Sequence, residues 1–247
     1  MTARGGREAE LADALAAVQS RLARAAEDAG RNVEDVELLP ITKFFPATDV
    51  AILSRLGCRS FGESREQEAA TKAVQLSELV SEPVQWHMVG QIQRNKARSL
   101  AGWASTAHSV SSTRVVAALD RAVGQALAGG RRADPLRVYI QISLDGDVSR
   151  GGVDMSRPGA VDEICGQVES CAALRLVGLM GIPPLEWDPE AAFSRLAAEH
   201  RRVRDTYPDA AGLSAGMSSD LEIAVKHGST CVRVGTALMG PRPLTSP

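Results

Sequence analysis

The chain has 247 residues, of which 44% are hydrophobic and 23% are charged, and its formal net charge is −2. This composition is that of a globular protein with a sizeable core. The small net charge gives no basic field for binding nucleic acid or an anionic membrane. No run of about 18 apolar residues could span a bilayer, and the charged start lacks the apolar core of a signal peptide, so we expect a cytoplasmic protein.

The four cysteines of the chain are scattered and form no CxxC pair. Metal-ligand spacing is therefore absent, and we expect reduced and mostly buried thiols. They are Cys58, Cys165, Cys171 and Cys231.

The chain begins with an amphipathic helix, predicted over residues 7–29, and then alternates between strands and helices. The predicted strands cover residues 36–42, 59–62, 84–89, 103–108, 136–143, 174–180, 212–217 and 231–235. The predicted helices cover residues 47–56, 64–79, 93–100, 112–128, 158–170, 189–206 and 220–227. Eight such strands predict a closed parallel (β/α)8 barrel of the TIM type over about residues 36–240, in a single domain 1–247. An open doubly wound sheet is the alternative.

Lys43 directly follows the first predicted strand, at the end of its apolar run, and Phe44-Phe45-Pro46 then turns away from it. A cationic side chain at the carboxyl end of a strand lies where α/β proteins place their chemistry. Lys43 is therefore the first candidate for a functional residue.

The segment from Ser214 to Glu222 reads as a strand end, a glycine, two serines and a helix start. Ser219 and Glu222 have the spacing of a capping box, which predicts that the helix begins there. The free N–H groups of such a start, together with the hydroxyls of Ser218 and Ser219, would suit a phosphate. A plain helix cap is the simpler alternative.

Val232-Arg233-Val234-Gly235-Thr236 places an arginine inside an apolar strand, where an unpaired charge is costly to bury. Gly235 allows close approach of a ligand, and Thr236 offers N–H and O–H donors. In a barrel these segments end strands seven and eight, whose loops form the usual phosphate site. An ion pair with a barrel carboxylate is the alternative for Arg233.

Three other strand ends carry polar residues. For His87 we favour a hydrogen-bonded core histidine over a ligand contact. Glu63 either places a polar group beside Lys43 or belongs to a turn. Gln141-Ile142-Ser143 precedes a polar loop through Ser149-Arg150-Gly151-Gly152, which we interpret as a possible lid.

In their order along the chain, these motifs resemble the pyridoxal phosphate homeostasis protein family, whose members have a barrel like the N-terminal domain of alanine racemase. The resemblance covers about residues 10–243. It rests on Thr42-Lys43, Phe61-Gly62-Glu63, Trp86-His87-Met88-Val89-Gly90, Gln93, Asn95-Lys96, Gly178-Leu179-Met180, Ser214 to Asp220 and Val232-Arg233-Val234-Gly235-Thr236.

The resemblance implies that Lys43 holds pyridoxal 5'-phosphate (PLP), a form of vitamin B6, as an imine or Schiff base. It also implies that Arg233 faces the pyridine nitrogen and that the phosphate is bound near the last two strands. The cofactor-binding set that we expect is Lys43, Met217, Ser218, Ser219, Arg233, Gly235 and Thr236.

The chain departs from the family pattern at four positions. The family usually has Asn at Ser64, an aromatic residue at Arg65, Asn at Ser143 and Lys at Arg150. Ser64 matters most, because the usual Asn would lie near the cofactor ring. We leave Ser64 out of the expected set for that reason.

The expected function is PLP binding in intracellular PLP homeostasis, without catalysis. An arginine stays protonated and would leave the pyridine nitrogen unprotonated, which makes the ring a weaker electron sink. A two-base racemase also needs an acid or base on the second face of the cofactor, and neither Tyr139 nor Tyr207 is an evident one. A PLP-dependent racemase or lyase acting on a small amino acid is the alternative, and a sugar-phosphate aldolase using Lys43 is a third. We expect a monomer whose partners are PLP and PLP-dependent apo-enzymes.

Overall fold

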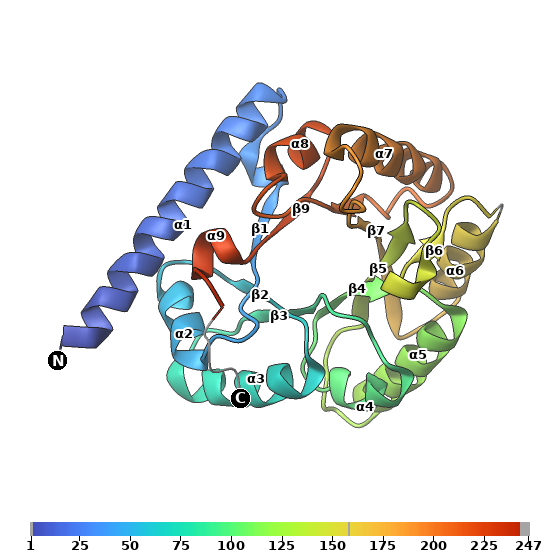
Figure 1. Cartoon of the computed structure of the whole chain (residues 1–247). Helices are drawn as coiled ribbons and strands as arrows, with labels where there is room; N and C mark the ends of the chain where they lie inside the picture. Colours follow the sequence, from blue (N-terminus) through green and yellow to red (C-terminus); the bar gives the residue numbers. More distant parts are fainter. Residues whose placement is uncertain (1, 158, 243–247) are drawn as a thin grey trace.

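Parallel strands form a ring surrounded by helices in the structure, a computed structural model that describes residues 2–157 and 159–242 (Figure 1). The order of the main strands around the ring is β1-β9-β8-β7-β5-β4-β3-β2, and β6 pairs with β5 at the edge. These strands are β1 (Glu37–Pro40), β2 (Ser60–Glu63), β3 (Gln85–Met88), β4 (Thr106–Val110), β5 (Leu136–Ser143), β6 (Val153–Asp154), β7 (Leu174–Gly181), β8 (Gly212–Ser214) and β9 (Cys231–Val234).

The ring closes between β1 and β2, the two strands at the ends of this order. Ile41, just beyond β1, forms a parallel bridge with Gly62 of β2, and the Thr42 N–H donates to the Gly62 carbonyl at 3.0 Å. An open sheet would leave these edges apart. The predicted TIM-type barrel is therefore confirmed, and the open doubly wound alternative is excluded.

Helices cover the outside of the ring because their apolar faces pack on the strands (Figure 1). They are α1 (Thr2–Asp28), α2 (Ala47–Arg55), α3 (Glu66–Leu79), α4 (Ala97–Leu100), α5 (Thr113–Ala128), α6 (Ala160–Glu169), α7 (Pro189–Thr206), α8 (Leu221–Lys226) and α9 (Thr236–Met239), with 3-10 turns η1 (Val33–Asp35), η2 (Arg94–Lys96) and η3 (Val148–Arg150). Within the described ranges, no helix has both the length and the apolar character needed to cross a membrane.

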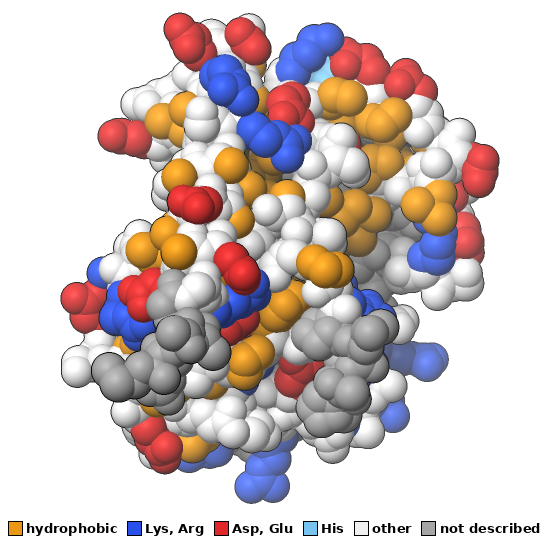
Figure 2. Space-filling model, turned by 60° about the vertical axis from the view of Figure 1, so that its left-hand side comes forward, with side chains coloured by type: hydrophobic (Ala, Val, Ile, Leu, Met, Phe, Trp, Pro, Cys, Tyr) orange, Lys and Arg blue, Asp and Glu red, His pale blue; other side chains and the backbone are white. Residues whose placement is uncertain are grey.

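The N-terminal helix α1 lies along the outside of the barrel, against α2, α8 and α9 (Figure 1). Its buried face is the apolar stripe that predicted it, formed by Leu11, Leu15, Val18 and Leu22. The helix begins at Thr2, five residues before the predicted start. Figure 2 shows acidic and basic side chains interspersed over one face of the molecule, as expected from the small net charge.

Most predicted strands differ from the structure by one or two residues at an end, and two of them differ by three. The fourth was predicted over 103–108, but Trp103 and Ala104 complete the turn of α4, where the Ala104 N–H donates to the Leu100 carbonyl at 2.9 Å. The strand predicted over 212–217 ends at Ser214, because the chain turns at Gly216. The short elements β6 and α9 were not predicted.

The predicted capping box at Ser219 is wrong. The N-cap of α8 is Asp220, one residue later, and its carboxylate accepts from the Met217 N–H at 2.6 Å. Glu222, which would complete the box, instead pairs with Arg21 of α1. A contact between distant elements has therefore taken the carboxylate that the local pattern assigned to the cap.

Candidate functional site

Lys43 follows β1 at the carboxyl end of the barrel and is half-buried. The next residue, Phe44, has φ of 70°, in the left-handed region that side chains other than glycine rarely adopt. The Lys43 Nζ atom lies 6.0 Å from the centre of the Phe44 ring. The guanidinium groups of Arg65 and Arg242 lie 5.0 and 3.8 Å from the same ring. Three cations therefore gather around one aromatic side chain.

The four lysines of the sequence differ in their partners. Lys72 bonds to Glu63 at 2.6 Å, Lys96 lies 3.4 Å from Glu66, and Lys226 lies 2.6 Å from Glu190. Within the described part of the chain, Lys43 is the lysine without a carboxylate partner. Its amine is therefore the one available to a ligand.

A buried polar cluster lies beneath the Lys43 loop. The Glu63 Oε1 atom accepts from the Thr42 hydroxyl at 2.7 Å and from Lys72 Nζ at 2.6 Å. Lys72 Nζ also donates to the Thr42 carbonyl at 2.9 Å and to Glu68 at 3.1 Å. Glu68 accepts from the Phe44 N–H at 2.7 Å. Glu63 thus reaches Thr42, the residue before Lys43, and burial raises the pKa of its carboxyl.

The segments predicted to bind phosphate follow β8 and β9, and β9 lies between β8 and β1 in the ring. The Ile41 N–H donates to the Val234 carbonyl at 2.9 Å, which places Gly235 and Thr236 beside the start of the Lys43 loop. The Ala237 N–H donates to the Ser218 hydroxyl at 3.3 Å and joins the two segments. Met217, Ser218, Ser219, Gly235, Thr236 and Lys43 therefore share one edge of the barrel.

This edge holds several unused hydrogen-bond donors. Among the described residues, no acceptor is found for the backbone N–H groups of Ser218, Ser219 and Thr236. Ser219 and Thr236 are exposed, and Ser218 is half-buried. Three amides and the nearby hydroxyls could therefore bind an anion without breaking an existing contact.

Gly216 makes the turn that brings these residues to the edge. Its φ is 90°, and a Cβ atom there would lie 2.6 Å from the Cβ of Ala224. Only glycine fits both the conformation and the space. The Arg233 N–H donates to the Gly216 carbonyl at 2.9 Å and fixes the turn on β9.

The Arg233 side chain lies inside the barrel, with 5% of the residue exposed. Its guanidinium donates to the Ser214 hydroxyl at 2.6 Å and to the Gly181 carbonyl at 3.1 Å. Burial lowers its pKa from the ordinary range. The alternative of an ion pair is not found in the described residues, because the partners are neutral oxygens from β7 and β8.

A chain of buried groups continues from Arg233 across the barrel. Ser214 bonds to His108 Nδ1 at 2.9 Å, and His108 Nε2 bonds to His87 Nδ1 at 3.0 Å. Burial lowers the pKa of His87 to about 4 and that of His108 well below 6.5. Both rings are therefore neutral near pH 7. The interpretation of His87 as a hydrogen-bonded core histidine is confirmed.

Neither tyrosine reaches this edge. Tyr139 stacks on His108 with ring centres 4.5 Å apart, and its hydroxyl lies beside Gly212, the first residue of β8. Gly212 is at the amino end of its strand, whereas Lys43 and Ser218 follow the carboxyl ends of β1 and β8. The Tyr139 hydroxyl is therefore at the other end of the barrel from Lys43. Tyr207 caps the carboxyl end of α7 on the outside.

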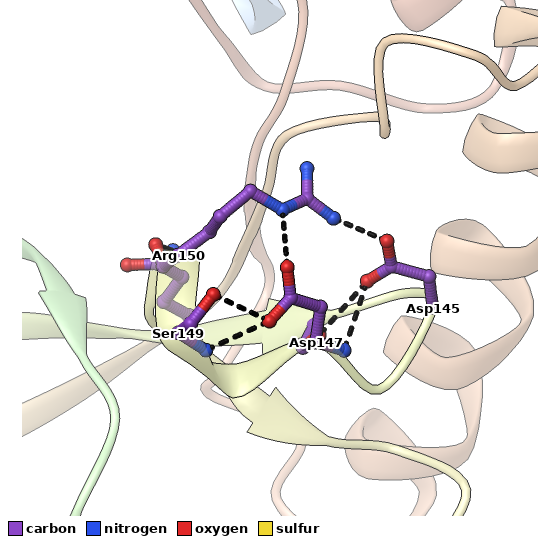
Figure 3. Close-up of polar contacts among 6 residues, drawn as sticks. Asp145, Asp147, Ser149 and Arg150 are labelled. Carbon is purple, nitrogen blue, oxygen red and sulfur yellow. Dashed lines mark hydrogen bonds and ion pairs between the residues drawn. The ribbon is translucent and has the colours of Figure 1, made fainter.

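The polar loop after β5 is folded on itself (Figure 3). Arg150 pairs with Asp147 at 3.1 Å and with Asp145, and Ser149 donates to Asp147 through its N–H and its hydroxyl. Ser143 donates to Asp145 at 3.2 Å. Ser143 and Arg150, two of the four residues that depart from the family pattern, are thus bonded within this loop. The interpretation of the loop as a lid stays a prediction.

A cleft of about 910 Å³ opens next to the edge that carries Lys43. It lies between the loop after β1, the start of α3 and the loop after β3, and its walls include Phe44, Ser64, Arg65 and Lys96. None of the seven expected cofactor residues lines it among the described residues. The cleft therefore adjoins the predicted site without coinciding with it.

Comparisons with known proteins place the chain in a family. Residues 14–243 match the family model of the alanine racemase N-terminal domain. The chain is 68% identical to the pyridoxal phosphate homeostasis protein of Mycobacterium leprae, over 98% of this chain and 97% of that protein. The chain belongs to the pyridoxal phosphate homeostasis protein family. The predicted resemblance is confirmed.

More distant relatives support the same assignment. The Escherichia coli K12 pyridoxal phosphate homeostasis protein is 34% identical over 94% of this chain and 97% of that protein. The structure of PipY from Synechococcus elongatus with PLP bound is 31% identical. It aligns with a TM-score of 0.78 over 93% of this chain and 100% of PipY.

Several residues of the site were not anticipated from sequence. His108 lies in an apolar strand, and its link to Ser214 joins residues 106 positions apart. Lys72 and Glu68 looked like ordinary residues of an exposed helix. The sequence signal for these two residues is their spacing of four, which predicts an ion pair on one helix face. That spacing does not predict the contacts of the pair with Thr42, Phe44 and Glu63.

Proposed function

We propose that this protein binds PLP and holds its aldehyde through the Lys43 amine. The observation that carries the proposal is that, among the described residues, Lys43 has no carboxylate partner while the other three lysines have one, and that it shares an edge with the amides of Ser218, Ser219 and Thr236. An amine beside a set of anion-binding donors suits a phosphorylated aldehyde. PipY is similar to this chain over 93% of its length, and its structure with PLP bound supports the same ligand.

The chain's own residues divide the work of binding. Met217, Ser218, Ser219, Gly235 and Thr236 would hold the phosphate end, since they carry the donors of the β8 and β9 loops. Arg233 would face the ring nitrogen from inside the barrel. Lys43 would hold the cofactor through its amine, since PLP would supply an aldehyde that condenses reversibly with an amine and releases water.

We further propose that the protein acts as a cytoplasmic carrier of PLP rather than as an enzyme. The Arg233 guanidinium has neutral partners and keeps its positive charge toward the ring, which disfavours a protonated ring nitrogen. Tyr139 lies away from Lys43, so a second base opposite the amine is not supplied by either tyrosine. A monomer that delivers PLP to apo-enzymes is consistent with this role.

The test separates binding from catalysis. Titration of the purified protein with PLP should produce a yellow absorbance band that is absent in Lys43→Ala. The loaded protein, incubated with alanine or serine in heavy water, should exchange the α-proton no faster than free PLP does. Absence of the band would overturn the binding proposal. Exchange at enzyme-like rates would overturn the carrier proposal and favour the racemase or lyase alternative.

A further inference from the structure

The Lys43 loop is held from below by one helix. The peptide groups on both sides of Lys43 bond to the same pair of α3 residues. The Thr42 carbonyl accepts from Lys72 Nζ at 2.9 Å, and the Phe44 N–H donates to Glu68 at 2.7 Å. Lys72 and Glu68 are themselves joined at 3.1 Å.

The anchor for this arrangement is buried at the end of β2. Glu63 is fully buried, and Lys72 has 4% of its surface exposed. Among the described residues, the polar contacts of the Lys72 ammonium are to Thr42, Glu63 and Glu68. Charge-assisted hydrogen bonds in a buried setting are short and strongly oriented, so they resist displacement of the groups that they hold.

The backbone that the cluster holds is strained. Phe44 has φ of 70° and is a phenylalanine, for which this conformation is unfavourable. Such a conformation persists only when surrounding contacts enforce it. The bond from the Phe44 N–H to Glu68 is a contact of that kind, because it fixes the peptide group that follows Lys43.

We propose that Glu68 and Lys72, anchored by Glu63, are positioning residues that hold the Lys43 backbone so that its amine meets the aldehyde of PLP. This deepens the proposed function and rests on it. Neither residue lies among the predicted phosphate contacts, so the cluster acts on imine formation rather than on docking of the cofactor. A small displacement of a reacting group can slow a reaction by roughly a hundredfold.

Glu68 gives the sharpest test because its side chain is 25% exposed and its replacement leaves the Glu63–Lys72 pair intact. Glu68→Ala removes the acceptor for the Phe44 N–H. Glu68→Gln keeps an oxygen at that place and removes only the charge. Gln67→Ala, on the exposed neighbouring position of α3, is the matched control.

Two ligands separate positioning from docking. PLP reports imine formation through its absorbance change. Pyridoxamine 5'-phosphate carries the same ring and phosphate but no aldehyde, so it reports docking alone. We expect Glu68→Ala to slow imine formation roughly tenfold to a hundredfold while its affinity for pyridoxamine phosphate stays within about twofold. Glu68→Gln and Gln67→Ala should stay near the wild-type rate.

Hydrogen exchange of the Phe44 amide in the protein without ligand provides a second readout. Glu68→Ala should exchange this amide faster, and Glu68→Gln should protect it. Wild-type rates of imine formation in Glu68→Ala, or a parallel loss of affinity for pyridoxamine phosphate, would overturn the proposal. If the wild-type chain itself formed no imine, the proposed function would fail instead. The exchange of the Phe44 amide would still show whether Glu68 holds the loop.

Discussion

Two buried polar clusters contact the two cationic residues of the candidate site, Arg233 through its side chain and Lys43 through the neighbouring backbone, and their chemistry is opposite. Inside the barrel, Arg233 is bonded to a hydroxyl and a carbonyl, and the chain continues through two neutral histidines. Beneath the Lys43 loop, Lys72 bonds to Glu63, to Glu68 and to the Thr42 carbonyl next to Lys43, and we call this group the rim cluster.

The difference lies in where charge is compensated. The rim cluster balances Lys72 with Glu63 and Glu68 and leaves the Lys43 side chain free. The cluster inside the barrel pairs Arg233 with neutral oxygens, and no ion pair to Arg233 is found among the described residues. One cluster therefore compensates its cation with carboxylates, and the other surrounds its cation with neutral oxygens.

The largest effect should come from removing the cation of the rim cluster. In Lys72→Met, the buried Glu63 carboxylate would lose its partner, and unpairing a buried charge costs about 3–5 kcal/mol. Urea unfolding at pH 7 measures this loss. The double variant Lys72→Met/Glu63→Gln should recover most of it, because no buried charge is then left alone. A single variant as stable as wild type would contradict the role of this pair.

The pH dependence of the same variant follows from Glu63. Burial raises the pKa of this carboxyl above 4.5, so the folded state keeps the proton to a higher pH than the unfolded state. The stability from protonated Glu63 is complete below pH 4.5 and is lost as the pH rises through the raised pKa. Without Lys72 that loss grows, so the deficit of Lys72→Met should shrink as the pH falls toward 4.5.

The contribution of His87, inside the barrel, to folding stability should change with pH in the opposite direction. The pKa of His87 falls from 6.5 to about 4 on folding. The contribution of His87 to the free energy of unfolding is therefore present above pH 6.5 and is lost as the pH falls through about 4. The shift between the two pKa values corresponds to roughly 3 kcal/mol. His87→Gln should remove this part of the decline between pH 7 and 4. Parallel stability curves for the two proteins would contradict a neutral, buried His87.

The proposed phosphate contacts should have a smaller effect, on affinity rather than stability. Ser219→Ala and Thr236→Ala each remove an exposed hydroxyl, and a hydrogen bond to a charged group contributes about 1.5–3 kcal/mol. Affinity for pyridoxamine 5'-phosphate, measured by calorimetry, should fall about tenfold or more in each variant. Ser149→Ala, in the loop after β5, is the control. Unchanged affinity would place the phosphate elsewhere.

The smallest effect is expected at an exposed ion pair near the same edge. Arg21 of α1 lies 2.8 Å from Glu222 and donates to the Ser218 carbonyl at 3.1 Å. The two charged side chains are 31% and 47% exposed, so their pairing contributes at most about 1 kcal/mol. Thermal unfolding of Arg21→Ala should show a small shift. A loss of stability as large as that of Lys72→Met would contradict the expectation that the buried Lys72–Glu63 pair matters more than the exposed Arg21–Glu222 pair.

Much of the fold could be predicted because the barrel repeats a local pattern. The predicted ranges 136–143 and 189–206 match β5 and α7 to the residue, since apolar strands and an Asp-Pro helix start are local signals. The end of β8 could not be predicted, because it depends on Gly216 packing against Ala224. The capping box at Ser219 failed because Arg21, distant in sequence, binds Glu222.

The candidate site divides in the same way. Lys43, Ser218 and Thr236 were identifiable because each follows a strand and carries a suitable side chain. The groups that hold them were hidden, because Lys72 meets Thr42 across 30 positions and His108 meets Ser214 across 106. Contacts of that range are set by the closed ring of strands and leave no periodic trace in the sequence.

The most direct measurement is the site at which PLP becomes attached. The protein is incubated with PLP, reduced with borohydride, digested and examined by mass spectrometry. The chain has four lysines, and three of them are paired with carboxylates, so the adduct should be confined to Lys43. An adduct on Lys72, Lys96 or Lys226, or no adduct at all, would contradict the assignment of Lys43 as the group that holds the cofactor.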